Sequence, residues 1–363
     1  PASTLSGRLT DVANGYAVAG LKLGGTATTM AGDVTITRGA KRFKVNAKTT
    51  SPLLDVTAFV HPAAAGGAPK PAVAGARIIP DVPLPLEVLR VIDADLDLRF
   101  DTVKFSEGAP LGPLLVRALI ADGVLKAEPV HLTGKSGQTL TLAGTVDATR
   151  SAWALDVEGK GIDFHEIVTR FGRPDIVTGG ITDLALHLQG TGKSVAAILG
   201  SLNGDAQLKV GPHRIHNFAI PLDKGIVMHM FGLANPFLKA DPNTEVKCFT
   251  ARVPIKNGII TSEQRVATET AKYNAVMSGT VNLRTEGLDL IVTPIVRGEV
   301  TTVVRLSGTL AAPVVDVNAV GAIAKRAVKL YATVATLGAW WVTDTLINTI
   351  AQDPSPCATA LVP

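Results

Sequence analysis

The feature that most constrains the fold of this chain is a short segment of alternating apolar and polar residues that recurs from end to end. Each segment runs for about five to ten residues and ends near Gly, Asp or Asn. Side chains on a strand point alternately to opposite faces, so each segment predicts a half-buried antiparallel strand with one wet and one apolar face. The apolar members of the clearest segments are Leu96, Leu98, Phe100, Leu140, Leu142, Val146, Trp153, Leu155, Val157, Leu184, Leu186 and Leu188.

Composition narrows what covers the apolar faces. Of the 363 residues, 46% are hydrophobic but only 4% are aromatic, so these faces consist mostly of Leu, Val, Ile and Ala. Aliphatic faces suit fluid acyl chains as readily as a packed core. The net charge of +4 is mild, and the basic residues are scattered without interleaved stacking aromatics. The sequence therefore argues against a nucleic-acid partner and leaves a weak attraction to anionic lipid headgroups open.

The pattern predicts a mainly β protein with a few helices and one long antiparallel sheet that has a continuous apolar face. We expect a strand block over 1–60, a flexible loop rich in Ala, Gly and Pro over 61–78, and a central sheet with short helices over 79–245. A second sheet covers 246–317, and a terminal helix and tail cover 318–363. Short helices are expected over 163–171, 194–199 and 222–231. Residues 1–10 are polar and show neither a signal-peptide nor a membrane-span pattern, as expected for a soluble piece of a longer protein.

The terminal helix, about residues 320–350, has an apolar stripe at helical spacing. Its uncharged run over 330–342 is too short to cross a bilayer, which needs about twenty residues. One interpretation is a lid or membrane contact over the last sheet, around Leu288, Leu290 and Val292. The other is an ordinary amphipathic helix packed on its own sheet. The candidate lid residues are Leu330, Val334, Leu337, Trp340 and Trp341.

No set of residues predicts catalysis, a metal ion or a cofactor. The run Gly190-Thr191-Gly192-Lys193-Ser194 resembles the end of a P-loop, but His187 stands where the first glycine of that motif belongs. The sequence also lacks a CxxC pair and a G-x-S-x-G motif. We therefore expect a strand-to-helix turn at 190–194 and a protein that is not an enzyme.

The two cysteines, Cys248 and Cys357, admit two interpretations. They are unrelated buried thiols, or they form one disulfide in an oxidising compartment. We expect the disulfide, because it would tie an otherwise loose tail to the last sheet.

Three segments together resemble a known family. They are the run IPDVPLPLEVLRVIDADL over 79–96, the pair GKSV and SLNG over 192–204, and a C-terminal stretch. That stretch comprises Cys248, IKNGI over 255–259, GTVNL over 279–283, LDL over 288–290 and PCA over 356–358. This combination is similar to the AsmA-like proteins of Gram-negative bacteria, which are related to TamB and other bridge-like lipid-transfer proteins.

The resemblance implies a periplasmic protein anchored in the inner membrane by an N-terminal helix that this chain does not contain. It also implies that the long antiparallel sheet curls into a groove, or trough, lined with apolar side chains. We therefore expect the chain to bind phospholipid, or another membrane lipid, and to carry it between the inner and outer membranes. The competing expectation is a scaffold for outer-membrane proteins with no lipid path, and an enzyme acting on envelope polymers comes third.

Overall fold

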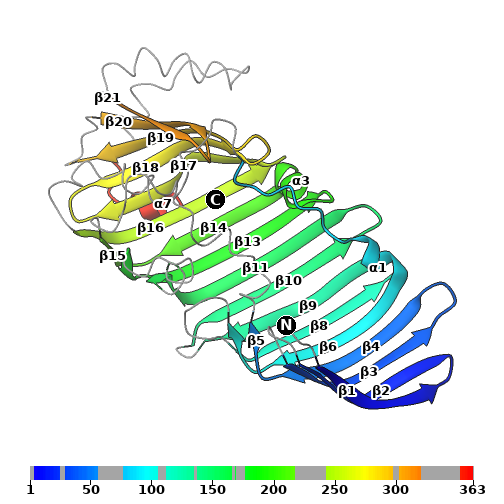
Figure 1. Ribbon diagram of the computed structural model, residues 1–363. Helices are drawn as coiled ribbons and strands as arrows, with labels where there is room; N and C mark the ends of the chain where they lie inside the picture. Colours follow the sequence, from blue (N-terminus) through cyan, green and yellow to red (C-terminus); the bar gives the residue numbers. More distant parts are fainter. Residues whose placement is uncertain are drawn as a thin grey trace. The chain divides into compact units, whose positions relative to one another are not determined.

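The computed structural model describes residues 4–24, 29–55, 77–104, 112–134, 137–165, 168, 176–216, 243–296, 302–319 and 352–362. The chain forms two compact units (Figure 1). Unit 1 comprises Pro1–Lys70, Asp81–Pro174 and Thr182–Gly204, and unit 2 comprises Pro71–Pro80, Asp175–Ile181 and Asp205–Pro363. Both units are built mainly of strands, as the alternating segments predict.

Unit 1 is a sheet whose strands follow chain order with one crossover. Its elements are β1 (Thr4–Val12), β2 (Gly15–Gly24), β3 (Thr29–Arg38), β4 (Phe43–Ser51), β5 (Leu54–Asp55), α1 (Glu87–Val91), β6 (Ile92–Phe100), β7 (Val103–Lys104), β8 (Leu114–Ala121), β9 (Val124–Thr133), β10 (Thr139–Asp147), β11 (Ala152–Asp163), β13 (Ile181–Thr191) and α3 (Val195–Gly200). Strands β1, β2, β3, β4, β6, β8, β9, β10, β11 and β13 pair in that order.

The expectation of an antiparallel sheet holds only in part, because the sheet is mixed and mostly antiparallel. Strand β4 pairs with β6 in parallel, from Phe43 opposite Ile92 to Ser51 opposite Phe100. The short strands β5 and β7 also pair in parallel, as a separate two-stranded sheet. Parallel neighbours need a long crossover connection, and here residues 52–91 return the chain to the same end of the sheet before β6 begins.

Tight turns explain why the other neighbours are antiparallel. The β8–β9 hairpin closes on Asp122-Gly123 and the β16–β17 hairpin on Asn257-Gly258, and all four residues have positive φ. A two-residue turn of this kind matches the right-handed twist of its strands, and Asn or Asp followed by Gly tolerates it best. These dipeptides therefore fix strand direction locally.

Unit 2 is also built mainly of strands, and the pairings described among them are antiparallel. Its elements are β12 (Val177–Gly179), β14 (Asn203–Val210), β15 (His213–His216), β16 (Asn243–Lys256), β17 (Ile259–Thr270), β18 (Asn274–Asn282), β19 (Gly287–Ile295), β20 (Thr302–Thr309), β21 (Pro313–Ala319) and α7 (Pro356–Thr359). Strands β16 to β21 form an unbroken meander, which matches the sheet expected over 246–317.

The short helix α7 is fastened to the β16–β17 part of this meander. Cys248 on β16 and Cys357 on α7 form a disulfide that closes a loop of 109 residues. The Thr250 hydroxyl donates to the Cys357 carbonyl (3.1 Å), and the Cys357 N–H donates to the Glu269 carboxylate (3.0 Å). The pairing is the one expected from the sequence. In the chain-entropy model a loop of this length contributes about 4.7 kcal/mol, less any strain.

The expected helices have different outcomes. The helix over 194–199 is α3. The helix expected over 163–171 begins at Phe164, directly after β11, and most of it lies outside the described residues. The helices expected over 222–231 and 320–350, and the loop over 61–78 except its last two residues, also lie outside them. Among the described residues, no helix is long and apolar enough to cross a bilayer.

A buried carboxylate holds one segment of unit 2 in place. Glu286, in the turn between β18 and β19, is only 2% exposed. Its carboxylate accepts the N–H groups of Ile78 (2.7 Å) and Ile79 (3.1 Å) and pairs with the Arg77 guanidinium (3.1 Å). Burial raises the pKa of the Glu286 carboxyl, but the three donors outweigh it and hold the pKa below its usual range.

We expect Glu286→Gln to destabilise the protein at neutral pH by about 1 to 3 kcal/mol, the range for hydrogen bonds to a charged group. Because the folded pKa is lowered, this stabilisation is complete above the unfolded pKa of about 4.3 and is lost as the pH falls through the folded pKa. Urea unfolding at several pH values measures it. The gap between wild type and Glu286→Gln should stay constant above about pH 5 and shrink below about pH 4.

The control is Glu263→Gln, which makes the same change on an exposed residue of β17. This variant should lie close to wild type at every pH. A gap for Glu286→Gln that does not change with pH would show that the negative charge of Glu286 does not hold the segment.

Candidate functional site

One face of the unit 1 sheet is mainly apolar, with Asp11 of the edge strand β1 as a charged exception opposite Tyr16. The strand pairing aligns apolar residues into rows that run across the strands. The first row crosses nine strands and consists of Leu9, Val18, Val34, Ala47, Leu96, Ala118, Ala127, Gly144 and Leu155. A second row beside it consists of Tyr16, Ile36, Val45, Ala94, Ile120, Leu125, Val146 and Trp153. We call this surface the apolar face.

The opposite face of the same sheet is mostly polar. Lys48 of β4 lies opposite Asp97 of β6, which lies opposite Arg117 of β8. The Lys160 and Glu158 side chains, both on β11, form an ion pair at 2.9 Å. Leu115 is an exposed apolar exception on this face, at 43% exposure. We call this surface the outer face. The contrast between the faces follows directly from alternation along each strand.

The apolar face is not a filled core at the strands that come first in the chain. Leu9 is 64% exposed, Tyr16 57% and Ile36 45%, although all three point to the apolar side. Leu155, on β11, is 42% exposed. Large apolar side chains in a continuous exposed surface mark a binding surface more often than a random distribution of exposed residues does.

One margin of the apolar face is closed. Phe100, Leu114, Val130 and Leu132 form a buried cluster with Val103 of β7. Other apolar residues pack against this cluster, namely Leu54, Leu98, Val116, Leu140 and Leu142. Strands β5 and β7 therefore seal this margin with a small core. The rows beside this margin are exposed on β1, β2 and β3 (at Leu9, Tyr16 and Ile36) and at Leu155, and they are buried at Ala94, Ala118 and Ile120. We call the exposed parts of the rows the open strip.

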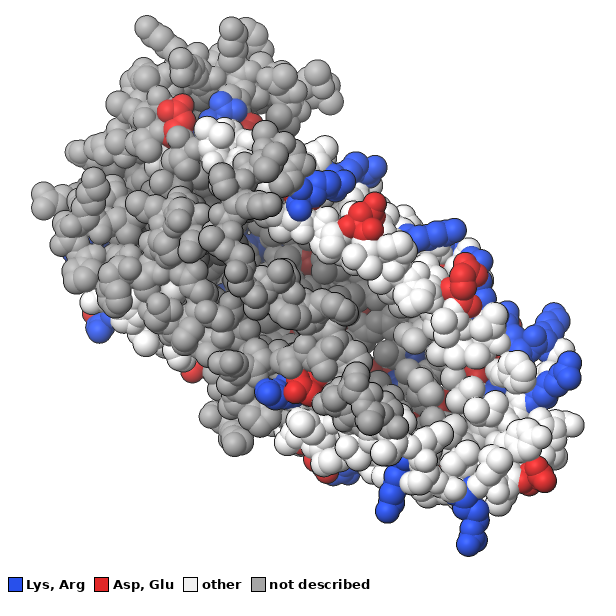
Figure 2. Space-filling model, viewed as in Figure 1, with Lys and Arg blue, Asp and Glu red and all other residues white. Residues whose placement is uncertain are grey.

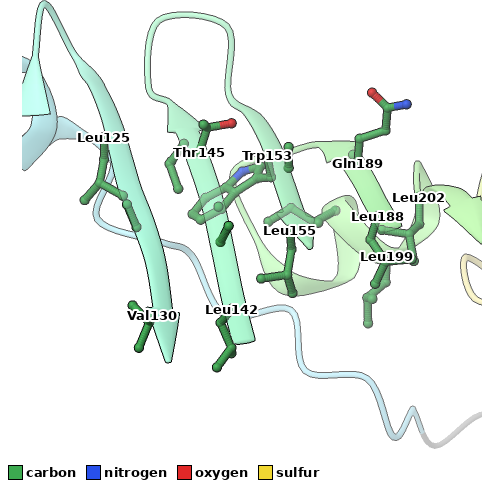
Figure 3. A pocket seen from close by; sticks show the side chains of 17 residues that line it. Leu125, Val130, Leu142, Thr145, Trp153, Leu155, Leu188, Gln189, Leu199 and Leu202 are labelled. Carbon is green, nitrogen blue, oxygen red and sulfur yellow. The ribbon is translucent and has the colours of Figure 1, made fainter. Parts of the chain in front are cut away.

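A cavity of about 470 Å³ lies on the apolar face where α3 covers it (Figure 3). Strands β9, β10, β11 and β13 and helix α3 supply its walls. The residues that line it are Leu125, Ala127, Val130, Leu142, Ala143, Gly144, Thr145, Val146, Trp153, Ala154, Leu155, Leu188, Gln189, Gly190, Ile198, Leu199 and Leu202. Among these residues none has an ionisable side chain, so the cavity is suited to hydrocarbon and offers no group for acid–base chemistry.

The ring of Trp153 forms part of the wall. Its indole N–H donates to the Gly192 carbonyl at 3.0 Å, so the polar atom of the ring is already satisfied. The cavity therefore meets only the apolar body of this side chain.

Helix α3 is held in place by its own N-terminus and by a crossing segment. The Ser194 hydroxyl accepts the Ala197 N–H (3.3 Å) and donates to the Asp81 carboxylate. Backbone bonds join Leu84 to Lys193 (2.8 Å) and Val195 to Val82 (3.4 Å). The segment over 81–84, which belongs to the stretch that resembles the AsmA-like signature, thus fastens the turn before α3 (Figure 1).

The predicted groove residues of unit 1 lie on the apolar face of β6, β10, β11 and β13, where strand pairing sets Leu142 beside Val157 and Val146 beside Trp153. Leu142, Val146, Trp153, Leu155 and Leu188 line the cavity. Leu98, Phe100 and Leu140 belong instead to the closed margin. Leu96 lies in the first row. The Leu184 side chain lies so close to Gly159 of β11 that a Cβ at that glycine would contact it. Leu186 shares the face of Leu184 and Leu188 by alternation.

Three predicted groove residues lie in a different environment. Leu288, Leu290 and Val292 are 5%, 3% and 2% exposed and form a packed cluster in unit 2 with residues such as Tyr273 and Leu306. They are core residues of that unit in this structure. The candidate lid residues, Leu330, Val334, Leu337, Trp340 and Trp341, lie outside the described residues.

The sequence interpretation missed part of the cavity wall. Leu125, Ala127 and Val130 were missed because a bulge at Glu128-Pro129 shifts the alternation of β9 by one residue. The sequence interpretation also missed Ile198, Leu199 and Leu202, because it did not say which surface the helix over 194–199 packs against. Pro129 was the signal in the sequence for the bulge in β9, because proline cannot donate a backbone hydrogen bond to the neighbouring strand.

The alternative chemistries find no support in the described parts of the chain. The turn at 190–194 places the Asp81 carboxylate against Ser194, where a P-loop would hold a phosphate. Cys248, Glu269 and Cys357 are the group of potential metal ligands found there, but the disulfide removes both thiolates.

The space-filling view shows unit 1 hollowed on the side that faces the reader (Figure 2). Many Lys and Arg side chains project along the edges around this hollow, and a few charged atoms are also visible inside it. Charged groups at the edges of a surface and apolar groups within it suit an amphipathic ligand.

Comparison with known proteins relates the chain to one family. The model of the AsmA family matches residues 3–264. The AsmA family protein YhjG of Escherichia coli (strain K12) is 25% identical over 262 residues, which cover 68% of this chain and 36% of that protein. The chain therefore spans about a third of the length of this relative. No solved structure matches the chain significantly.

The geometry predicts that one substitution has different effects at two neighbouring sites of the apolar face. Leu142 packs against the buried cluster of the closed margin, whereas Leu155 is 42% exposed. We expect Leu142→Asp to destabilise the protein by about 3 kcal/mol or more, because it buries a charge and removes packing. Leu155→Asp should cost less than about 1 kcal/mol. Urea unfolding measures both, and equal large losses would show that the face is a sealed core.

Proposed function

The chain belongs to the AsmA family, and from that premise we propose that it is a periplasmic lipid-binding protein. The apolar face of unit 1 receives the acyl chains of a phospholipid or another membrane lipid, and the protein carries that lipid between the inner and outer membranes. No covalent bond forms or breaks, so the work of the protein is to shield hydrocarbon from water.

One observation carries the proposal, which is the nine-strand row of apolar side chains that remains partly exposed. At the two ends of this row, Leu9 is 64% exposed and Leu155 is 42% exposed. An acyl chain in water costs about 0.8 kcal/mol per exposed methylene, or about 13 kcal/mol for sixteen carbons. A row of apolar side chains contacts the acyl chain along its length. This contact removes much of the free-energy cost of exposing the acyl chain to water.

The polar groups support a carrier with little headgroup selectivity. The described cavity wall has no ionisable side chain, and the ion pairs Arg117–Glu128 and Lys160–Glu158 lie on the outer face. Lipid headgroups would therefore stay in water while the acyl chains contact the sheet. Such an arrangement suits transport of bulk membrane lipid better than recognition of one headgroup.

The disulfide supports the proposed compartment. Bonds such as Cys248–Cys357 persist in oxidising environments, which include the bacterial periplasm, and are rare in the cytosol. A protein that moves lipid between two envelope membranes works in that compartment.

A scaffold for outer-membrane proteins is the second candidate, and unit 2 favours it. There the apolar face around Leu288, Leu290 and Val292 is buried in a packed cluster and leaves no open strip at these residues. A protein whose sheets were packed in this way throughout would have no room for lipid.

Native mass spectrometry of the full chain separates the two functions. We expect wild type purified from Gram-negative cells to carry lipid masses that Leu155→Asp loses. The matched control is Leu115→Asp, which makes the same change at 43% exposure on the outer face. This control should keep its lipid. A wild-type protein without lipid, or equal loss in both variants, would contradict the proposal and favour the scaffold.

A further inference from the structure

We infer that the cavity beneath α3 is a seat for one acyl chain, at the end of the two apolar rows where α3 covers them. The inference rests on the proposed function and adds to it a defined site with one kind of occupant. The open rows allow lipid to slide, whereas a cavity walled by four strands and a helix holds a chain in one place.

The volume of the cavity matches a single chain. A methylene group takes about the same space as a water molecule in the liquid, about 30 Å³. The cavity of about 470 Å³ therefore has room for on the order of fifteen methylenes. This is the length of one ordinary membrane acyl chain, and two chains would not fit.

Small residues create this space. Ala127 on β9 and Gly144 on β10 lie opposite each other in the first row. Larger side chains lie on either side, with Val146 and Trp153 toward one end of the strands and Leu142 toward the other. Helix α3 contributes Ile198 and Leu199 to the same cavity, and Leu202 follows just after the helix. The cavity therefore forms above Ala127 and Gly144, where the side chains are small, and the larger neighbouring side chains enclose it.

The walls also determine the chemistry of the occupant. The indole N–H of Trp153 is satisfied by Gly192, and Ser194 and Asp81 satisfy each other outside the lining. No ionisable group lines the described wall that could anchor a headgroup, a sugar or a peptide. A hydrocarbon chain needs no polar partner, so it is the occupant that these walls suit.

Trp153 provides the measurement. Bromine atoms on an acyl chain quench tryptophan fluorescence on contact, and Trp153 lies in the wall. The full chain with Trp340→Phe and Trp341→Phe contains Trp153 as its only tryptophan. The probe is hexadecanoic acid with two neighbouring bromines on its chain. We expect saturable quenching at one probe per protein, and native mass spectrometry counts the bound probes independently.

Chain length and one substitution make the test specific. Unbrominated competitors should bind about fourfold more tightly per added methylene and level off near sixteen carbons, where the cavity is full. Ala127→Leu fills the cavity and should reduce quenching at least tenfold. Ala121→Leu, the same change at an exposed position on the outer face of β8, should leave quenching unchanged. Because the length series uses no cavity variant, it decides the question even if Ala127→Leu fails to fold.

The outcomes separate this inference from the proposed function. Bound probe that leaves Trp153 unquenched, or affinity that keeps rising beyond twenty carbons, would overturn the seat and leave lipid binding on the open strip intact. A protein that binds no probe and carries no lipid would overturn both. Saturable quenching with the expected length limit would support the seat.

Discussion

The alignment of alternating strands is the constraint on which the rest of this structure depends. Each strand of unit 1 separates its apolar and polar side chains, but separation within a strand is not enough. Neighbouring strands must pair so that the apolar side chains form continuous rows, and a slip of one residue would send a whole strand's apolar set to the other face. The row from Leu9 to Leu155 shows that pairing holds across nine strands.

Bulges maintain these rows where the sequence shifts phase. From Val18 to Leu21, strand β2 advances by three residues, whereas its partner β3 advances by two, from Val34 to Gly32. Gly20, in this bulge, has a positive φ. The Gly20 N–H is held by the Asp33 carboxylate at 3.0 Å. Strand β9 has a similar bulge between Ala127 and Val130. In both cases the extra residue returns the following apolar side chains to the apolar face.

Much of the local structure followed from the sequence, because alternation and turn chemistry are local properties. Strands such as β10 and the strand-to-helix turn before α3 were predicted on that basis. The parallel pairing of β4 with β6 was not, because it depends on a crossover rather than on the residues of either strand. Alternation also identifies an apolar face without saying what covers it. For that reason it could not distinguish the exposed Leu155 from the buried Leu290.

The central claim is that acyl chains lie on the apolar face of unit 1, and site-specific photocrosslinking in Gram-negative cells tests it most directly. A photoreactive residue would replace Val34, Ile36 or Leu96 on the apolar face, and Thr35, Thr37 or Asp95 on the outer face of the same strands. Lipid adducts should appear at the first three positions and be absent from the second three, so that the yield alternates along each strand. Equal yields on both faces, or no lipid at Val34, Ile36 and Leu96, would contradict the account.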